Sequence, residues 1–208
     1  MKAALALPGV EYERQAWARE LVCAGIDEAG RGPLFGPLMV GAVILNEHDL
    51  PEAYDSKSLS AARREELAQE VREKAISHAV GAVSAREIDD IGMSSALSLA
   101  ARRAIDGLVA RPDRILVDGP RDFTRSGIEA VCLVKGETHS RSIAAASLLA
   151  KVAHDDVVRS LATQFPGYGI ERNMGYGTAE HMEALRCLGP TSEHRRSFRP
   201  VREVSSDL

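Results

Sequence analysis

Acidic residues stand at the ends of several apolar runs that the sequence predicts to be strands. The candidates are Asp27 and Glu28 at the end of "VCAGID", Asp118 in "RILVDG", and Glu137 directly after "AVCLVKG". Active sites of α/β proteins gather at the strand ends of one sheet. Carboxylate oxygens suit Mg²⁺ or Mn²⁺, and two such ions about 4 Å apart promote phosphodiester hydrolysis. Each acid alone is more typical of a solvated turn, but their joint placement favours a metal site.

Asp27 and Glu28 are neighbours in the chain, which constrains how they act together. Adjacent side chains of a regular strand face opposite sides, so these two share a metal only where the strand breaks. Gly30 supplies such a break, at the start of "GRGPLFG". That pattern fails the dinucleotide fingerprint, because a second apolar strand follows it, and no G-x-x-x-x-G-K-[ST] occurs. The turn Gly30-Arg31-Gly32 therefore predicts close backbone approach to a ligand, with Arg31 offering a fork for phosphate.

Three further residues have both a functional and an ordinary interpretation. Ser142 opens a predicted long helix, whose unpaired N–H groups and dipole could attract phosphate near the acids. Lys151 lies two turns further on and could face the same region, although a surface lysine is commonly solvated. Tyr176, in "NMGYGT", could stack on a sugar or base, although a loop tyrosine more often packs locally. The histidines lack ligand spacing, which favours structural roles for them.

The elements that must position these residues alternate between strands and helices. Strands are predicted at 22–27, 38–45, 78–85, 114–119 and 130–136, and helices at 60–75, 95–110, 142–165 and 178–188. Ser60 is the expected first residue of its helix, in which Glu70 and Lys74 are four residues apart. This order predicts an α/β protein with a mixed five-stranded sheet flanked by helices and a helical C-terminal region.

Composition sets outer limits on the class of protein. The 208 residues are 45% hydrophobic and 27% charged, without repeats, which predicts one globular domain over 1–208. We interpret about 1–20 as a lead-in segment and expect no membrane span, because no uncharged apolar window reaches roughly 18 residues. Three widely separated cysteines disfavour a disulfide framework or zinc site and favour a cytoplasmic protein with reduced thiols.

The net charge of −4 disfavours indiscriminate binding of nucleic acid. The distribution of charged residues along the chain is more informative. Arginines outnumber acids strongly near the C-terminus. They stand at positions 186, 195, 196, 199 and 202, against the single acid Glu193. These arginines form either a solvated basic tail or a phosphate-binding face, and composition alone favours neither.

Several motifs, in order, resemble one known family. They are "GIDEAGRGPLFGP", "DSKSLS", "ILVDG", "LVKGETHSRSIAAASLLAKVAHDD", "FPGYGIERNMGYGT" and "HRRSF". From about residue 24 to 201 the chain is similar to bacterial ribonuclease HII, the type 2 ribonuclease H. The resemblance implies a ribonuclease H-like fold that cleaves the RNA strand of RNA–DNA hybrids. It also implies nicking 5′ of single ribonucleotides in duplex DNA, as in ribonucleotide excision repair. Products with a 3′-hydroxyl and a 5′-phosphate, a Mn²⁺ or Mg²⁺ cofactor and a monomeric protein are expected.

The same resemblance assigns roles by motif. The implied catalytic metal ligands are Asp27, Glu28, Asp118 and Glu137, with Asp155 as a fallback. Gly30, Arg31 and Gly32 are implied to contact the ribonucleotide and its 2′-OH, the group that separates RNA from DNA. Tyr176 is implied to stack on the deoxyribose beyond the RNA–DNA junction, and Lys57 and Lys151 to hold phosphates. The helical region at about 166–208 is implied to contact the substrate.

The chain departs from the family pattern at a few positions. Glu137 replaces the usual aspartate of a "KGD" motif, so its carboxylate reaches roughly 1.5 Å further, and we expect activity with altered metal dependence. Met174 stands where a basic residue commonly precedes "GYGT", and Phe35 replaces the usual alanine. Two alternatives stay open. One is a hybrid-binding protein with impaired catalysis, and the other is a different two-metal nuclease of this fold, such as a junction resolvase.

Overall fold

A mixed five-stranded sheet forms the centre of the protein. The computed structural model describes residues 7–56 and 59–206. Its strands are β1 (Cys23–Ala29), β2 (Leu38–Ile44), β3 (Ser77–Val83), β4 (Arg114–Asp118) and β5 (Glu129–Leu133), in the order β3-β2-β1-β4-β5. β1, β2 and β3 pair antiparallel, whereas β4 is parallel to both β1 and β5. The mixed five-stranded sheet predicted from the sequence is confirmed.

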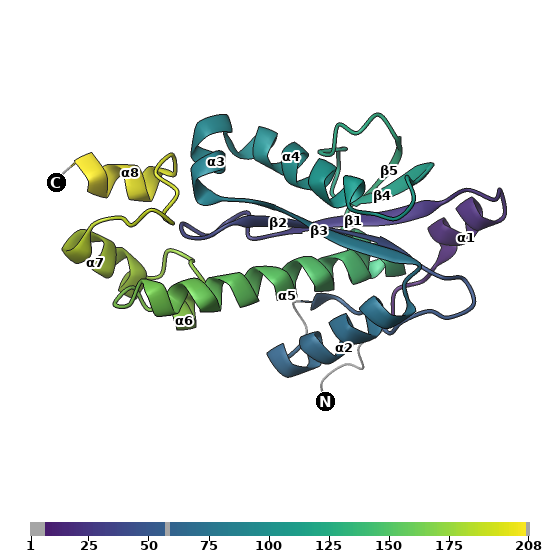
Figure 1. Ribbon diagram of the computed structural model, residues 1–208, viewed down its shortest axis with the longest axis horizontal. Helices are drawn as coiled ribbons and strands as arrows, with labels where there is room; N and C mark the ends of the chain where they lie inside the picture. Colours follow the sequence, from purple (N-terminus) through teal and green to yellow (C-terminus); the bar gives the residue numbers. More distant parts are fainter. Residues whose placement is uncertain (1–6, 57–58, 207–208) are drawn as a thin grey trace.

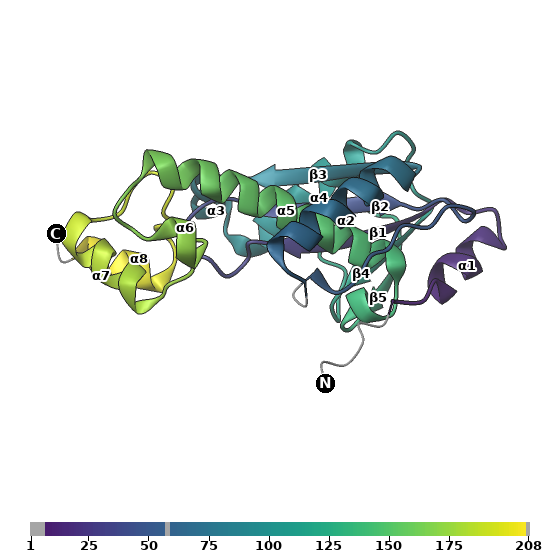
Figure 2. The same cartoon turned by 90° about the horizontal axis from the view of Figure 1, so that it is seen from below.

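Helices cover both faces of this sheet (Figure 1). Helix α4 (Met93–Asp106), with α3 (Ala85–Ile91) beside it, lies on one face, and α5 (Arg141–Gln164) with α2 (Ala61–Lys74) lies on the other. Helix α1 (Glu11–Trp17) lies at one end of the molecule. The opposite end holds α6 (Ile170–Asn173), α7 (Ala179–Leu188) and α8 (Arg199–Ser206) (Figure 2). The 3₁₀ turn η2 (Gly136–Thr138) precedes α5.

The four helices predicted from the sequence are α2, α4, α5 and α7. The Ser60 side chain accepts a hydrogen bond from the Arg63 N–H, which caps α2 as expected, and Lys74 lies 2.9 Å from Glu70. Helix α3 was missed because the preceding strand was extended to residue 85, whereas β3 ends at Val83. The signal for α3 is a capping box, in which Ser84 and Glu87 exchange hydrogen bonds.

The long helix α5 packs closely on β1 and β2 because both strands carry a glycine beneath it. A Cβ on Gly25 would lie 2.1 Å from the carbonyl carbon of Ser142, and one on Gly41 would lie 2.2 Å from the carbonyl oxygen of Ala146. Any side chain at either position would collide with backbone atoms of the helix. This close contact, predicted from the small residues of α5, fixes the N-terminal half of the helix against β1 and β2.

The first turn of α5 differs from the prediction that Ser142 opens the helix and leaves its N–H groups for a ligand. Ser140 is the capping residue, and it accepts a hydrogen bond from the N–H of Ile143. The N–H and hydroxyl of Ser142 both donate to the buried carboxylate of Glu13, at 2.9 and 2.7 Å. Since α1 provides a carboxylate for these donors, this helix terminus does not serve phosphate.

The C-terminal helices share an apolar cluster with the loop between β1 and β2. Phe35 and Leu34 from that loop pack with Val158 of α5, Leu185 of α7 and Val201 of α8. Phe35, whose replacement of the usual alanine had no sequence-based explanation, is fully buried here.

The described residues contain no helix long and apolar enough to cross a membrane. The cysteines are free thiols, and only Cys23 is buried.

Candidate active site

The parallel pairing of β1 with β4 brings two of the predicted acids side by side. The register pairs Ile26 with Val117, so the next residues along the two strands are Asp27 and Asp118. The break expected at Gly30 is present, because β1 ends at Ala29 and Gly30 has φ of +81°, but Asp27 and Glu28 both lie within the strand that precedes it. Glu28 nevertheless belongs to the same cluster, since its charge raises the pKa of Asp27 and the charge of Asp118 raises the pKa of Glu28.

Burial and mutual repulsion make the negative charge of these carboxylates unfavourable. Burial, followed by the nearby Glu28 and Asp118, raises the pKa of Asp27 well above its ordinary value. Hydrogen bonds from Ser147 and from the Glu28 N–H, at 2.8 Å from Asp27 Oδ1, only partly oppose this rise. Burial also raises the pKa of Glu28, against the opposing effect of Arg31, whose guanidinium lies 3.6 Å from the Glu28 carboxylate.

A divalent cation fits this set of oxygen donors. Asp27, Glu28 and Asp118 carry hard oxygen donors of the kind that such a cation prefers, and a nearby positive charge would remove the repulsion that disfavours their charged forms. Within residues 7–56 and 59–206, no three acidic, imidazole or thiol side chains converge closely enough to hold an ion.

A cavity of about 250 Å³ unites most of the predicted site residues. Its lining includes the acids Asp27, Glu28 and Asp118, the turn Gly30, Arg31 and Gly32, Lys151 and Tyr176, together with Ser56 and Ser147. The two serine hydroxyls lie 3.1 Å apart, and Ser147 also bonds Asp27. Neither serine was predicted from the sequence. Lys57, predicted to hold a phosphate, lies outside the described residues.

Glu137 lies near this cavity but does not line it. It is 8% exposed in the turn η2, which follows Lys135 in a left-handed conformation. The N–H of the preceding Gly136 donates to Asp118 Oδ1 at 2.6 Å, which fixes η2 against the end of β4. The backbone thus brings Glu137 to the edge of the acidic cluster, one residue from a direct contact with Asp118.

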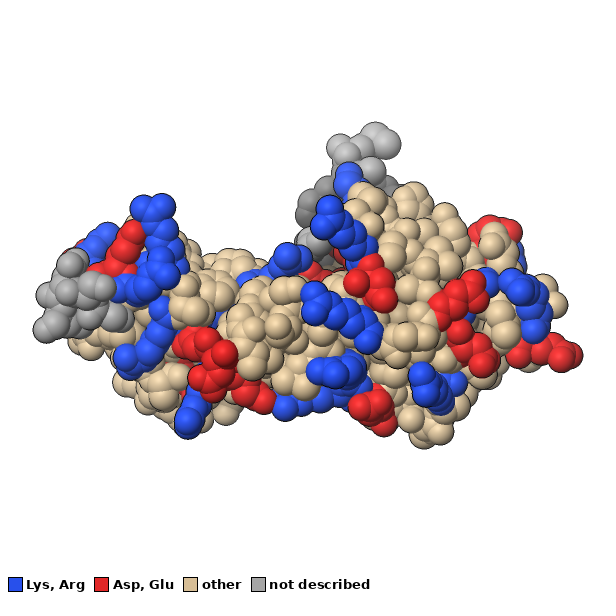
Figure 3. All heavy atoms as spheres, turned by 90° about the horizontal axis from the view of Figure 1, so that it is seen from above, with Lys and Arg blue, Asp and Glu red and all other residues tan. Residues whose placement is uncertain are grey.

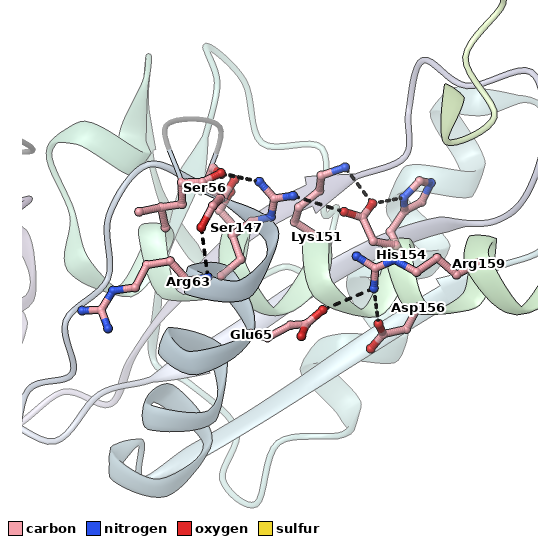
Figure 4. Close-up of polar contacts among 12 residues, drawn as sticks. Ser56, Arg63, Glu65, Ser147, Lys151, His154, Asp156 and Arg159 are labelled. Atoms are coloured by element: carbon pink, nitrogen blue, oxygen red, sulfur yellow. Dashed lines mark hydrogen bonds and ion pairs between the residues drawn. The ribbon is translucent and has the colours of Figure 1, made fainter. Parts of the chain in front are cut away.

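The fallback ligand Asp155 is surrounded by cationic and hydrogen-bonding groups. Lys151 Nζ lies 2.7 Å from Asp155 Oδ1, His154 Nδ1 lies 3.2 Å from the same oxygen, and Arg64 lies 3.6 Å from the other (Figure 4). Burial favours the neutral acid, but the bonds from His154 and Lys151 outweigh it and lower the pKa of Asp155. Asp155 therefore orients Lys151 at the cavity edge, as one of several residues on α5 that flank the site.

The Gly30-Arg31-Gly32 turn is held in place by His154 of α5 and by Arg195 of the C-terminal region. Gly30 has φ of +81°, and a Cβ there would lie 2.4 Å from the His154 ring, so glycine is required. Arg195, between α7 and α8, is fully buried and donates to the carbonyl oxygens of Gly30 and Arg31. The sequence left Arg195 in either a solvated basic tail or a phosphate-binding face, and neither interpretation included this contact.

Tyr176 is held by its backbone while its ring stays half exposed. The His181 ring bonds the Tyr176 carbonyl oxygen at 2.9 Å, and His181 Nε2 lies 3.0 Å from His194 Nε2. Because the Thr191 N–H donates to His194 Nδ1, neutral His194 carries its proton on Nε2 and donates to His181. His181 then carries its proton on Nδ1 and donates to Tyr176. The structural roles expected for these histidines agree with this arrangement.

The surface around the site is concave and bordered by cations. Figure 3 shows a hollow between the C-terminal helices and the rest of the molecule, with Lys and Arg side chains on both sides of it. Arg31 is among the exposed cations that line the cavity, with 63% of its side chain accessible. This shape and charge suit the backbone of a nucleic acid.

Solved structures with the same fold are named ribonuclease H2, RNase HII and RNase HIII. Ribonuclease H2 from Pyrococcus horikoshii OT3 matches with a TM-score of 0.73 and 24% identity, over 89% of this chain and 97% of that one. Ribonuclease HII of Archaeoglobus fulgidus, solved as a complex with PCNA, matches with a TM-score of 0.70 and 28% identity, over 86% and 96%. A Bst-RNase HIII structure in complex with Mn²⁺ has a TM-score of 0.69 and 20% identity, over 90% and 70%. The fold is therefore ribonuclease H-like, as the sequence resemblance implied.

Sequence comparison narrows this class to one family. The family model described as Ribonuclease HII matches residues 24–201. Ribonuclease HII of Paracidovorax citrulli is 46% identical over 97% of this chain and 84% of its own length. The Neisseria gonorrhoeae ribonuclease HII is 45% identical over 88% of this chain and 95% of its own. The chain belongs to the ribonuclease HII family and is a hydrolase.

Proposed function

We propose that the protein cleaves the RNA strand of RNA–DNA hybrids and nicks duplex DNA on the 5′ side of a single embedded ribonucleotide. The products carry a 3′-hydroxyl and a 5′-phosphate. The observation that carries this proposal is the cavity in which buried, mutually repelling carboxylates lie beside the Gly30-Arg31-Gly32 turn and the Tyr176 ring. Membership of the ribonuclease HII family supports the same activity.

The carboxylates of Asp27, Glu28 and Asp118 are the proposed ligands of Mg²⁺ or Mn²⁺, with Glu137 completing the set. When bound there, such ions supply an activated water and stabilisation of the leaving oxygen. The protein's own contribution is to hold the carboxylates at fixed strand positions and to bind Asp27 through Ser147. Of the two alternatives, Glu137 is preferred to Asp155 because cations already surround Asp155.

The remaining cavity residues bind and orient the substrate. Arg31 and Lys151 are cations at the cavity and are proposed to bind the phosphates that flank the scissile bond. The backbone of Gly30 and Gly32 is proposed to contact the ribose 2′-OH, which a DNA strand lacks. The Tyr176 ring, 47% exposed and 3.3 Å from a Cβ placed on Gly32, is proposed to stack on the adjoining deoxyribose.

A cleavage assay tests the proposed function. A 5′-labelled duplex with one ribonucleotide is incubated with Mg²⁺, Mn²⁺ or EDTA, next to an all-DNA duplex of the same sequence. We expect a single nick 5′ of the ribonucleotide with either metal, and none in EDTA or in the all-DNA duplex. Asp27→Asn and Asp118→Asn should abolish the nick. Asp106→Asn, exposed at the C-terminal end of α4, is the matched control and should cleave at the wild-type rate.

Two outcomes would replace the proposal. Tight, metal-independent binding of the same duplex without any nick would identify a hybrid-binding protein that lacks catalysis. Cleavage of an all-DNA four-way junction, with the ribonucleotide duplex left intact, would identify a junction resolvase on this fold.

A further inference from the structure

Arg195 is the largest side chain that is fully buried in the described part of the protein. Burial of a guanidinium is costly unless its donors are satisfied. No carboxylate in the described residues forms an ion pair with it. Four carbonyl oxygens accept its hydrogen bonds instead, those of Gly30 at 2.6 Å, Arg31 at 3.1 Å, Gly36 at 3.0 Å and Pro37 at 2.9 Å. Only the planar fork of arginine offers enough donors for this set.

These four carbonyls lie at the two ends of the loop that joins β1 to β2. Arg195 therefore clamps the start of the loop, Gly30 and Arg31, to its end, Gly36 and Pro37. The backbone of the same segment adds to the clamp, because the Arg195 N–H donates to the Leu34 carbonyl. The conformation of the loop thus depends on a residue far away in the sequence, between α7 and α8.

The clamp also sets the direction of two backbone donors. In a trans peptide the N–H points opposite to the C=O. With the carbonyls of Gly30 and Arg31 turned toward Arg195, the N–H groups of Arg31 and Gly32 point away from it. Neither N–H forms a hydrogen bond within residues 7–56 and 59–206, and Gly30, Arg31 and Gly32 line the cavity. Two oriented donors are thereby left for a ligand.

We propose that Arg195 is a positioning residue that sets the selectivity of this site for a ribonucleotide. Its guanidinium holds the Gly30–Gly32 backbone so that the N–H groups of the turn meet the ribose. The inference rests on the proposed function of the cavity. It adds to that function a residue outside the cavity, which touches neither substrate nor metal.

Kinetics on two duplexes test the proposal. The KM for cleavage of a single-ribonucleotide duplex is compared with the Ki of the matching all-DNA duplex as a competitor, under the same metal. Arg195→Lys keeps the charge but loses most of the carbonyl contacts. We expect the KM to rise about tenfold, as for the loss of one or two hydrogen bonds, while the Ki of the all-DNA duplex changes less than about twofold.

Leu67→Ala is the control for loss of stability, because Leu67 is buried in α2 within an apolar cluster that contains no residue of the β1–β2 loop. It should lower the melting temperature and leave the KM and the Ki of the folded protein unchanged. If Arg195→Lys does not fold, Phe198→Leu carries the test. The Phe198 ring lies 5.3 Å from the guanidinium, and its removal should raise the KM about threefold with the Ki unchanged.

The outcomes separate this inference from the proposed function. A parallel rise of KM and Ki, or no change in either, would show that Arg195 has only a structural role. A wild-type protein that does not cleave the ribonucleotide duplex would instead overturn the proposed function, before any variant is compared.

Discussion

Acidification should loosen the C-terminal region through His194. Burial, then the charges of His181 and Arg196, lowers the pKa of His194 from 6.5 to about 3. Its neutral ring accepts from Thr191 and donates to His181, and it packs edge-on against Phe35 at a centroid distance of 5.0 Å. A second proton on this ring would remove the acceptor that Thr191 requires.

The expected magnitude follows from the two pKa values. Above pH 6.5 the His194 ring is neutral in both the folded and the unfolded protein, so it contributes no pH dependence. Below pH 6.5 the unfolded chain binds a proton that the folded protein excludes. The free energy of unfolding then falls by about 1.4 kcal/mol for each pH unit, down to about pH 3. Between pH 7 and pH 5 this amounts to about 2 kcal/mol, and His181, whose pKa burial also lowers, acts in the same direction.

The assay compares urea unfolding of the wild type with that of His194→Asn at pH 7, 6 and 5. Asparagine can still accept from the Thr191 N–H but does not titrate. The variant should be less stable at pH 7, and the gap between the two proteins should narrow by about 2 kcal/mol at pH 5. His48→Asn, in an exposed loop, is the control and should leave the gap to wild type constant. Parallel curves for the wild type and His194→Asn would refute the reasoning.

Three further predictions concern the metal site, the core and a helix cap. Glu137→Gln should reduce cleavage at least about tenfold with Mg²⁺ and with Mn²⁺, whereas Glu137→Asp should retain activity and change the Mg²⁺ to Mn²⁺ ratio. Full activity of the glutamine variant would exclude Glu137 as a ligand. Gly41→Ala should lower the free energy of unfolding by about 3 kcal/mol or more, measured by urea denaturation, and Gly9→Ala, which has room for a Cβ, should change it little. In the wild type, the ion pair with Arg103 and the hydrogen bonds from Ser84 lower the pKa of Glu87 to about 2. The variant Glu87→Gln keeps the capping box but loses this ion pair. The stability that the Glu87 charge contributes is present above pH 4.5 and is lost as the pH falls toward 2. The variant should therefore be about 0.5 kcal/mol less stable than the wild type at pH 7 and equally stable near pH 2.

The proximity of Asp27 and Asp118 could be predicted because it follows from local rules. Both acids lie at or near the ends of apolar strands, and the carboxyl ends of parallel neighbours such as β1 and β4 lie at the same edge of a sheet. The predicted helices 60–75 and 178–188 were confirmed for a similar reason, since Ser60 and Thr178 are capping residues that act within one turn.

The contacts that complete the site could not be predicted, because each joins residues far apart in the sequence without a visible complementary pattern. Arg195 binds carbonyl oxygens, which every residue carries, so no acidic partner marks its role. Glu13 binds the N–H and hydroxyl of Ser142, and nothing near Glu13 in the sequence indicates a helix terminus. The position of Glu137 beside the cavity depends on the bond from Gly136 to Asp118, which the chain order alone does not specify.

The contact between the Glu13 carboxylate and the first turn of α5 bears on the order in which the protein folds. Glu13 and Ser142 are separated by 129 positions in the chain, so we expect this contact, which closes a long loop, to form late. During synthesis, Glu13 leaves the ribosome well before Ser142 exists. Until α1 docks, the N–H and hydroxyl of Ser142 lack the acceptor that Glu13 provides, and we expect the first turn of α5 to fray despite its Ser140 cap. Exchange of the Ser142 amide hydrogen should therefore report the docking of α1, separately from exchange in the middle of α5. A variant shortened to begin at Leu21 would keep every cavity residue described. It would lack Glu13, so the Ser142 donors at the start of α5 would have no carboxylate to bind.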